Sequence, residues 1–241
     1  YSLSIPFHDD DIRVYVNGTV VYTHIGCCDA HGCFWSGYLD GSSTIEVRHL
    51  DGVGGSQQSL TFTQLVDPAT YGNNQWNIYN YTANFGVNVG YATNTTTSEF
   101  NLGAFGMGVT SNPASLSGYL GCNPGDDNWA MRARRQGFPC GVYNVSLAGY
   151  DDNYTIAIDF DGNGSTDYSN SGTCCNNGTG VLWTGVLNSN SKVELTLVEG
   201  GGDAYLDVDF NLITPTLNGG TIAGISDGVT ICYNTDPGDF L

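Results

Sequence analysis

The sequence contains an internal repeat, which restricts its fold more than any other feature. The segment that starts at Tyr1 (YSLSIPFHDDDIRVYV) matches the one that starts at Tyr143 (YNVSLAGYDDNYTIAI). Both copies end in a Gly cluster and an alternating strand, GVGGSQQSLTF in the first copy and GGGDAYLDVDF in the second. A period of about 145 residues is the size of a domain and is too long for one turn of a solenoid. The sequence therefore predicts copies of one domain-sized module.

The two copies differ in extent. Residues 1–65 (the first unit) match only the second half of a module, whereas residues 66–213 (the second unit) hold a complete copy. The run PTLNGGTIAGISDGVT within residues 214–241 is typical of a linker that enters the first strand of a following module. The strand pattern that begins at the first residue suggests a piece of a longer protein. We expect one partial and one complete module in tandem, followed by the start of another.

Alternation of apolar and polar residues recurs along both units. Ile12, Val14 and Val16 alternate with Arg13 and Tyr15, and the runs KVELTLV and YLDVDF of the second unit have the same period of two. This period is typical of half-buried strands, and abundant Asn, Ser, Thr, Gly and Tyr favour strands and turns over helices. We predict an all-β protein made of antiparallel β-sandwich or jelly-roll-like modules.

The charge of the chain excludes several classes of partner. It has 6 Lys and Arg against 24 Asp and Glu, which gives a net charge of −18. Such a polyanion repels phosphate backbones and anionic lipids, so we expect no nucleic-acid partner and no membrane insertion. The one basic cluster, Arg132, Arg134 and Arg135, is expected to pair with neighbouring Asp.

Eight cysteines in an acidic chain indicate an oxidising, extracellular compartment. A zinc site fits poorly, because two pairs are directly adjacent and the histidines (His8, His24, His31 and His49) occur only in the first quarter of the chain. We expect a loop-closing disulfide between Cys122 and Cys140. The adjacent pairs could form vicinal disulfides or bond to distant partners; they are Cys27 with Cys28 and Cys174 with Cys175.

The second unit resembles a known family over most of residues 130–213. The run RRQGFPCGVYNVSLAGYDDNYTIAIDFDG, the turn WTGVL and the strand pair SKVELTLVEGGGDAYLDVDF are similar to the β-sandwich shared by the protective-antigen domain and the flocculin lectins. The vicinal cysteines and the tail GGTIAGISDGVTICYNTDPG are similar to segments of the giant surface adhesins of gliding bacteria, which are exported by type-nine secretion.

That resemblance implies a calcium site at the paired aspartates. Neighbouring side chains on a regular strand point to opposite faces, so two adjacent Asp share a ligand only where the backbone departs from that geometry. In the lectins the departure is a cis peptide bond, and the calcium ion holds sugar hydroxyls. By resemblance the metal ligands here are Asp9 with Asp10 and Asp151 with Asp152, and the nearby ligand-binding candidates are Asp11, Asn153 and Asp203. The alternative is that these runs are solvated strand ends or turns.

A second calcium candidate follows the Asp151–Asp152 pair. Asp159, Asp161, Asn163 and Asp167 have the spacing of the first nine positions of a calcium-binding loop. The twelfth position is Asn170 rather than Glu, and the flanks read as strands. An elongated hairpin and a calcium-stiffened hairpin both agree with this pattern.

The sequence contains no arrangement of residues typical of catalysis. It has no G-x-S-x-G or H-E-x-x-H motif and no His after His49, so we expect no enzyme. Two functions agree with the residues. One is an extracellular, cell-surface adhesin repeat that binds glycans or cell-surface polymers with calcium as cofactor and uses neighbouring copies in a tandem array or fibre. The other is a structural repeat of an extracellular filament or surface layer, stiffened by calcium and disulfides.

Overall fold

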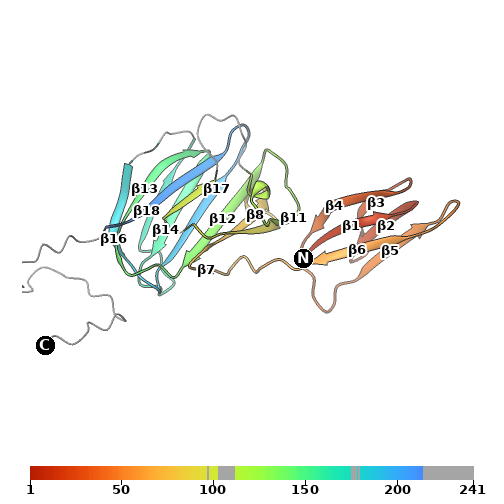
Figure 1. Ribbon diagram of the computed structural model, residues 1–241, viewed down its shortest axis with the longest axis horizontal. Helices are drawn as coiled ribbons and strands as arrows, with labels where there is room; N and C mark the ends of the chain where they lie inside the picture. Colours follow the sequence, from red (N-terminus) through yellow and green to blue (C-terminus); the bar gives the residue numbers. More distant parts are fainter. Residues whose placement is uncertain (97, 103–111, 175–177, 179, 214–241) are drawn as a thin grey trace, which may run out of the picture.

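The computed structural model confirms the predicted fold class: the protein is all-β, and its strands form several antiparallel sheets in sandwich-like layers (Figure 1). It describes residues 1–96, 98–102, 112–174, 178 and 180–213. The linker and strand expected within 214–241, and Cys175, lie outside the described residues. In the part that is described, no helix is long and apolar enough to cross a membrane.

The first unit consists of two three-stranded antiparallel sheets. Its strands are β1 (Ser2–His8), β2 (Asp11–Val16), β3 (Thr19–His24), β4 (Asp29–Ser36), β5 (Ile45–Leu50) and β6 (Gln58–Thr63). One sheet has the order β4-β1-β6 and the other the order β3-β2-β5. Ile5 from the first sheet and Ile12 and Val14 from the second are buried together, as the alternating sequence predicts.

The second unit is larger and has a more extensive core. Its strands are β7 (Gly72–Asn73), β8 (Trp76–Thr82), β9 (Asn88–Asn94), β10 (Glu99–Leu102), β11 (Leu120–Gly121), β12 (Trp129–Gln136), β13 (Gly141–Asp151), β14 (Asn153–Asp159), β15 (Tyr168–Gly172), β16 (Gly180–Leu187), β17 (Lys192–Val198) and β18 (Tyr205–Ile213). One sheet has the order β10-β18-β13-β16, and the other runs β11-β9-β8-β12-β17-β14-β15 with β7 beside β12. Trp76, Phe100 and Phe210 fill the space between them.

The last six strands of the second unit pair in the same order as the six strands of the first. The orders β16-β13-β18 and β15-β14-β17 correspond to β4-β1-β6 and β3-β2-β5. The registers also agree, because Asp11 lies opposite Leu50 just as Asn153 lies opposite Val198. The strands of the first unit therefore have structural counterparts in the second, and paired positions within these strands can be compared residue by residue.

A disulfide between Cys33 on β4 and Cys122 after β11 joins the two units, which lie side by side in Figure 1. The Ser36 hydroxyl adds a hydrogen bond to the Val89 carbonyl oxygen at 3.1 Å. The predicted bridge between Cys122 and Cys140 is therefore wrong: β4 packs beside β9, and this brings the Cα atoms of Cys33 and Cys122 to 4.8 Å. Cys140 is also disulfide-bonded, but not to Cys122.

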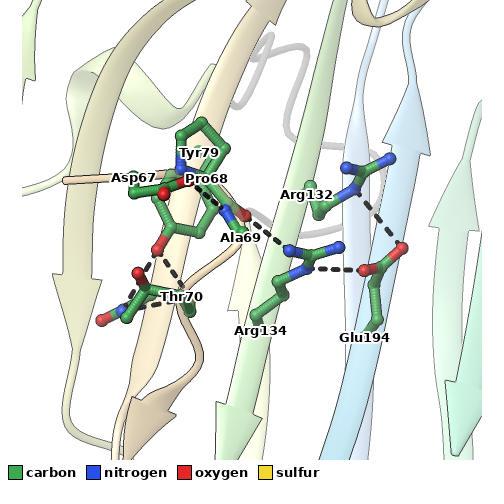
Figure 2. A network of polar contacts seen from close by, with 9 residues as sticks. Asp67, Pro68, Ala69, Thr70, Tyr79, Arg132, Arg134 and Glu194 are labelled. Atoms are coloured by element: carbon green, nitrogen blue, oxygen red, sulfur yellow. Dashed lines mark hydrogen bonds and ion pairs between the residues drawn. The ribbon is translucent and has the colours of Figure 1, made fainter. Parts of the chain in front are cut away.

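The basic cluster on β12 makes contacts within the protein rather than forming an exposed basic patch. Figure 2 shows Arg132 and Arg134 side by side on β12, both directed at Glu194 of the neighbouring strand β17, with nitrogen to oxygen distances of 3.3 and 2.6 Å. Arg134 also donates to the Pro68 carbonyl oxygen at 2.6 Å, which fixes the segment that enters the second unit. For Arg132 and Arg134 the expectation of Asp partners is wrong, because β12 and β17 are hydrogen-bonded neighbours and place Glu194 opposite Arg134.

Candidate functional site at the paired aspartates

Asp151 and Asp152 lie at the corner where β13 ends and β14 begins. The peptide bond between them is cis. One oxygen of each carboxylate and the sulfur of Cys174 lie within 4.8 Å of one another. Cys174 is disulfide-bonded, so its sulfur is not a thiolate that could bind a metal. The Asp152 carboxylate accepts a hydrogen bond of 2.8 Å from the Gly200 backbone N–H. The structure thus brings this predicted pair together.

Glu199 is buried against the same pair. It follows β17 and is only 2% exposed, and within the described part of the chain no donor group reaches either of its carboxylate oxygens. Burial first, and then Asp152, through its charge and a proton shared between the two carboxyl groups, and the charges of Asp151 and Asp127 raise the pKa of Glu199 to about 8. A buried carboxylate with two unsatisfied oxygens is costly unless something neutralises it. Either a proton or a bound cation would neutralise Glu199 at neutral pH.

The surrounding groups add further negative charge. Burial raises the pKa of Asp151, and the neighbouring carboxylates of Asp152 and Asp203 raise it further. Asp127 and Asp203 are exposed at the rim, where the Gly202 N–H donates to Asp127 at 3.2 Å. Calcium binds six to eight oxygens, mainly from carboxylates, carbonyls and water. Carboxylate oxygens of Asp151 and Asp152 converge as the ligands of such an ion do, and Glu199, whose pKa these two residues raise, lies nearby.

The other predicted ligands of this site have different positions. Asp203 lies in the exposed loop before β18 and is close enough to influence the charge state of Asp151. Asn153 is exposed at the start of β14 and pairs with Val198 across the sheet. The structure therefore associates Asp203 with the pair, whereas it places Asn153 in the strand ladder.

The corresponding corner of the first unit is arranged differently. Asp10 has a left-handed backbone with φ of 67°, and no group of three converging ligand residues in the described segments contains both Asp9 and Asp10. Asp9 faces the disulfide between Cys27 and Cys28, with its oxygen 2.9 Å from the Cys27 sulfur.

One backbone contact nevertheless repeats between the units. Asp10 accepts from the Gly52 N–H at 2.9 Å, as Asp152 does from Gly200. Asp11 accepts from the Gly26 N–H at 2.8 Å. The counterpart of Glu199 is the exposed Asp51. The structure does not bring Asp9, Asp10 and Asp11 together as it does the second pair.

The second candidate calcium site is a hairpin loop between β14 and β15. Carboxylate oxygens of Asp159, Asp161 and Asp167 lie within 4.8 Å of one another. Asp159 accepts three backbone N–H groups of the loop, from Gly162 at 2.7 Å, Asn163 at 3.1 Å and Gly164 at 2.8 Å.

Two further side chains in and beside this loop also have protein partners. Asn163 accepts from the Ser165 N–H at 2.7 Å, and Asn170, at the twelfth position, lies in β15 and accepts from the Tyr154 hydroxyl. The loop is therefore a hairpin held by its own hydrogen bonds, and calcium binding there stays a prediction.

Two sets of residues at possible binding sites were not identified from the sequence. Glu199 stands in the EGG run that carries the resemblance, but only the fold reveals that it is buried beside the Asp pair. His8, His24 and His31 each place one ring nitrogen within 4.8 Å of the others. Their confinement to the first unit was visible in the sequence, and comparison with the second unit could have flagged them.

No family model matches the chain, and no curated protein does. Among solved structures, the fold is similar to a PA14 sugar-binding domain from an RTX adhesin, with 13% identity and a TM-score of 0.41 over 59% of this chain and 96% of that one. It is also similar to an anti-sigma factor domain-containing protein from Clostridium clariflavum, with 10% identity and a TM-score of 0.30 over 88% of this chain and 73% of the other. At these levels neither likeness assigns an activity.

Proposed function

We propose that this chain is a calcium-assisted carbohydrate-binding repeat of an extracellular, cell-surface adhesin. The observation that carries the proposal is the buried Glu199, whose two unpartnered oxygens lie beside the convergent pair Asp151 and Asp152. The charges of Asp152 and Asp151 raise the cost of ionising Glu199, and Asp152 raises that of ionising Asp151. A divalent cation would remove that cost and satisfy the buried oxygens at once.

The site is placed so that a ligand could reach such an ion. Asp151 and Asp152 are half-buried, and the rim formed by Gly200, Asp203 and Asp127 is exposed. Three carboxylates supply only part of the six to eight oxygens that calcium prefers, so the rest come from water or from a ligand. Neighbouring hydroxyls of a sugar are oxygens of the required kind. In this proposal Asp151, Asp152 and Glu199 hold the ion, and the rim selects the sugar.

The compartment follows from the covalent chemistry of the chain. Disulfides such as Cys27–Cys28 and Cys33–Cys122 form and persist in oxidising environments. An isolated sugar site of this kind binds weakly, and copies displayed in tandem would raise avidity through effective concentration. Type-nine export and a tandem or fibre arrangement belong to the proposal on the sequence resemblance alone.

A purely structural role is the alternative, and one observation favours it. The Cys33–Cys122 disulfide and the hydrogen bond from Ser36 to Val89 fix one unit against the other. A filament or surface-layer repeat would need such stiffness and no sugar. In that case any calcium bound at the Asp pair would only stabilise the corner of the sheets.

Glycan binding separates the two functions. The protein, displayed at high density on beads, is applied to a glycan array in calcium and in EDTA. The variant Asp152→Asn is compared with Asp10→Asn, its counterpart in the first unit, and circular dichroism confirms that both are folded. We expect a sugar signal that is lost in EDTA and in Asp152→Asn but kept in Asp10→Asn. No signal from the wild type at any density would contradict the lectin function and favour the structural one.

A further inference from the structure

Three histidines from three strands meet at one end of the first unit. His8 ends β1 and His31 lies on the adjacent strand β4, while His24 ends β3 in the facing sheet. The ring centroids lie 4.5 to 5.0 Å apart, and one ring nitrogen of each lies within 4.8 Å of the others. His8 is fully buried, and the side chain of His24 is 28% exposed. The cluster thus bridges the two sheets and opens to solvent on one side.

The hydrogen bonds define which nitrogens are free to bind. The Nδ1 atom of His8 lies 2.8 Å from the carbonyl oxygen of Asp10, which can only accept, so Nδ1 carries the proton. The Nε2 lone pair of His8 then points at Nε2 of His31, 2.9 Å away. The Nδ1 atom of His24 is buried, and in the described structure it has no hydrogen-bond partner. In the metal-free protein Nε2 of His31 therefore carries a proton and donates it to the His8 lone pair. A metal ion bound between these rings would take the place of that proton, which would leave or move to Nδ1 of His31.

The fold itself does not require imidazoles at this place. His8 precedes the Asp pair of the first unit as Tyr150 precedes that of the second. His24 lies opposite Ile12 and Gly172 lies opposite Tyr154, at matched positions of the two sheets. The second unit fills this space by packing Tyr150 on Tyr154, with ring centroids 4.4 Å apart.

The third histidine follows the same pattern. His31 lies opposite Ile5, and its counterpart Gly180 lies opposite Leu147. The same corner of the sandwich therefore contains tyrosines packed over glycines in the second unit and three histidines in the first. Histidines at all three of these positions indicate a role that the scaffold alone does not explain.

We propose that His8, His24 and His31 bind a divalent transition-metal ion, with Zn²⁺ as the best match. Imidazole nitrogens suit zinc and its neighbours in the first transition row, whereas calcium prefers oxygen. A tetrahedral zinc ion with bonds of about 2.0 to 2.1 Å holds its ligand nitrogens about 3.3 Å apart. The present separations bracket that value, so small rotations of the rings complete the site. Three protein ligands leave the fourth position to water or to an external ligand.

The surroundings supply the support that metal-binding histidines usually have. The Asp10 carbonyl holds the His8 ring through Nδ1, and Asp29 lies 3.7 Å from Nε2 of His24. Such outer partners fix ring orientation and tautomer. Without a metal, the buried His24 nitrogen is left unsatisfied.

Calorimetric titration of Zn²⁺ into the EDTA-stripped full chain, in saturating calcium, tests the proposal. We expect one zinc ion per chain in the wild type and an affinity lower by about 100-fold in His24→Gln and His31→Gln. His49→Gln is the matched control, because His49 contacts the Asp9 carbonyl and Ser56 rather than the cluster. Its affinity should equal that of the wild type.

Co²⁺ in place of Zn²⁺ provides a spectroscopic readout that is independent of any variant's folding. Four-coordinate cobalt with nitrogen ligands gives strong visible bands, whereas cobalt on carboxylate oxygens gives weak ones. We expect strong bands in the wild type, displaced by Zn²⁺. Weak bands only, or zinc binding that is unchanged in His24→Gln and His31→Gln, would overturn the proposal.

Discussion

Replacing Glu199 by Gln removes the charge of the buried carboxylate and keeps its size and polar atoms. In the calcium-free protein, burial and then Asp152, Asp151 and Asp127 raise the pKa of Glu199 from 4.5 to about 8. At pH 7, a shift of this size lowers the free energy of unfolding by about 3 kcal/mol relative to a carboxyl group that keeps its ordinary pKa. We therefore expect Glu199→Gln to stabilise the calcium-free protein by about 1 to 3 kcal/mol at pH 7.

The effect changes with pH and with calcium in a defined direction. Because the pKa of Glu199 is higher in the folded than in the unfolded state, its favourable contribution is complete below pH 4.5 and is lost as the pH rises through about 8. The advantage of the Gln variant in EDTA should therefore grow over this range. In saturating calcium the order reverses, because the ion stabilises the wild type and the variant has lost one of its ligands.

Urea unfolding followed by circular dichroism at pH 5, 7 and 8 measures the change in the free energy of unfolding. The measurement in EDTA tests the expected gain in stability, and the one in calcium tests the expected loss. Asp51→Asn is the control, because Asp51 is the exposed counterpart of Glu199, and its effect should stay within about 0.5 kcal/mol. Equal or lower stability of Glu199→Gln in EDTA at pH 7, with the control unchanged, would refute the reasoning.

Three further perturbations follow from the structure. Burial, then Asp209 and Glu99, raise the pKa of Asp207 to about 6, so its stabilising contribution is lost as the pH rises from 3.8 through 6. Asp207→Asn should therefore raise the free energy of unfolding by about 1 to 3 kcal/mol at pH 7 and flatten its pH dependence, as measured in thermal melts. Replacing Cys33 and Cys122 together by Ser opens a closure of 89 residues and should cost up to about 4 to 5 kcal/mol in urea unfolding. Asp159→Ala removes the acceptor of three loop N–H groups and should cost about 2 to 3 kcal/mol in EDTA as well as in calcium; a loss seen only in calcium would mean that these hydrogen bonds contribute little.

The strands and the turns between them could be predicted from the sequence, because they depend on residues close together in the chain. The alternation around Ile12, Val14 and Val16 placed a strand there, and the structure has β2 with these side chains buried. The Asp-rich segment from Asp159 to Asp167 has the pattern of a hairpin, with or without bound calcium, and its flanking strands pair as β14 and β15. Period-two burial and turn chemistry act over a few residues, so they can be read from the sequence directly.

Contacts between distant segments could not be predicted in this way. Cys122 bonds to Cys33 rather than to the nearer Cys140, because the packing of β4 against β9 decides which sulfurs meet. The burial of Glu199 depends on the Asp corner closing over it. The same limit applies to the histidines: metal-ligand spacings in a sequence detect local sites, whereas His8 and His24 reach each other from facing sheets.

The position of a bound cation tests the central claim most directly. Crystals of the full chain grown in calcium, with anomalous diffraction recorded, locate calcium without reference to any variant. The account predicts an anomalous peak about 2.3 to 2.6 Å from carboxylate oxygens of Asp151 and Asp152, with Glu199 directed at it. Saturating calcium without a peak at this corner, and with the two Asp carboxylates turned apart, would contradict it.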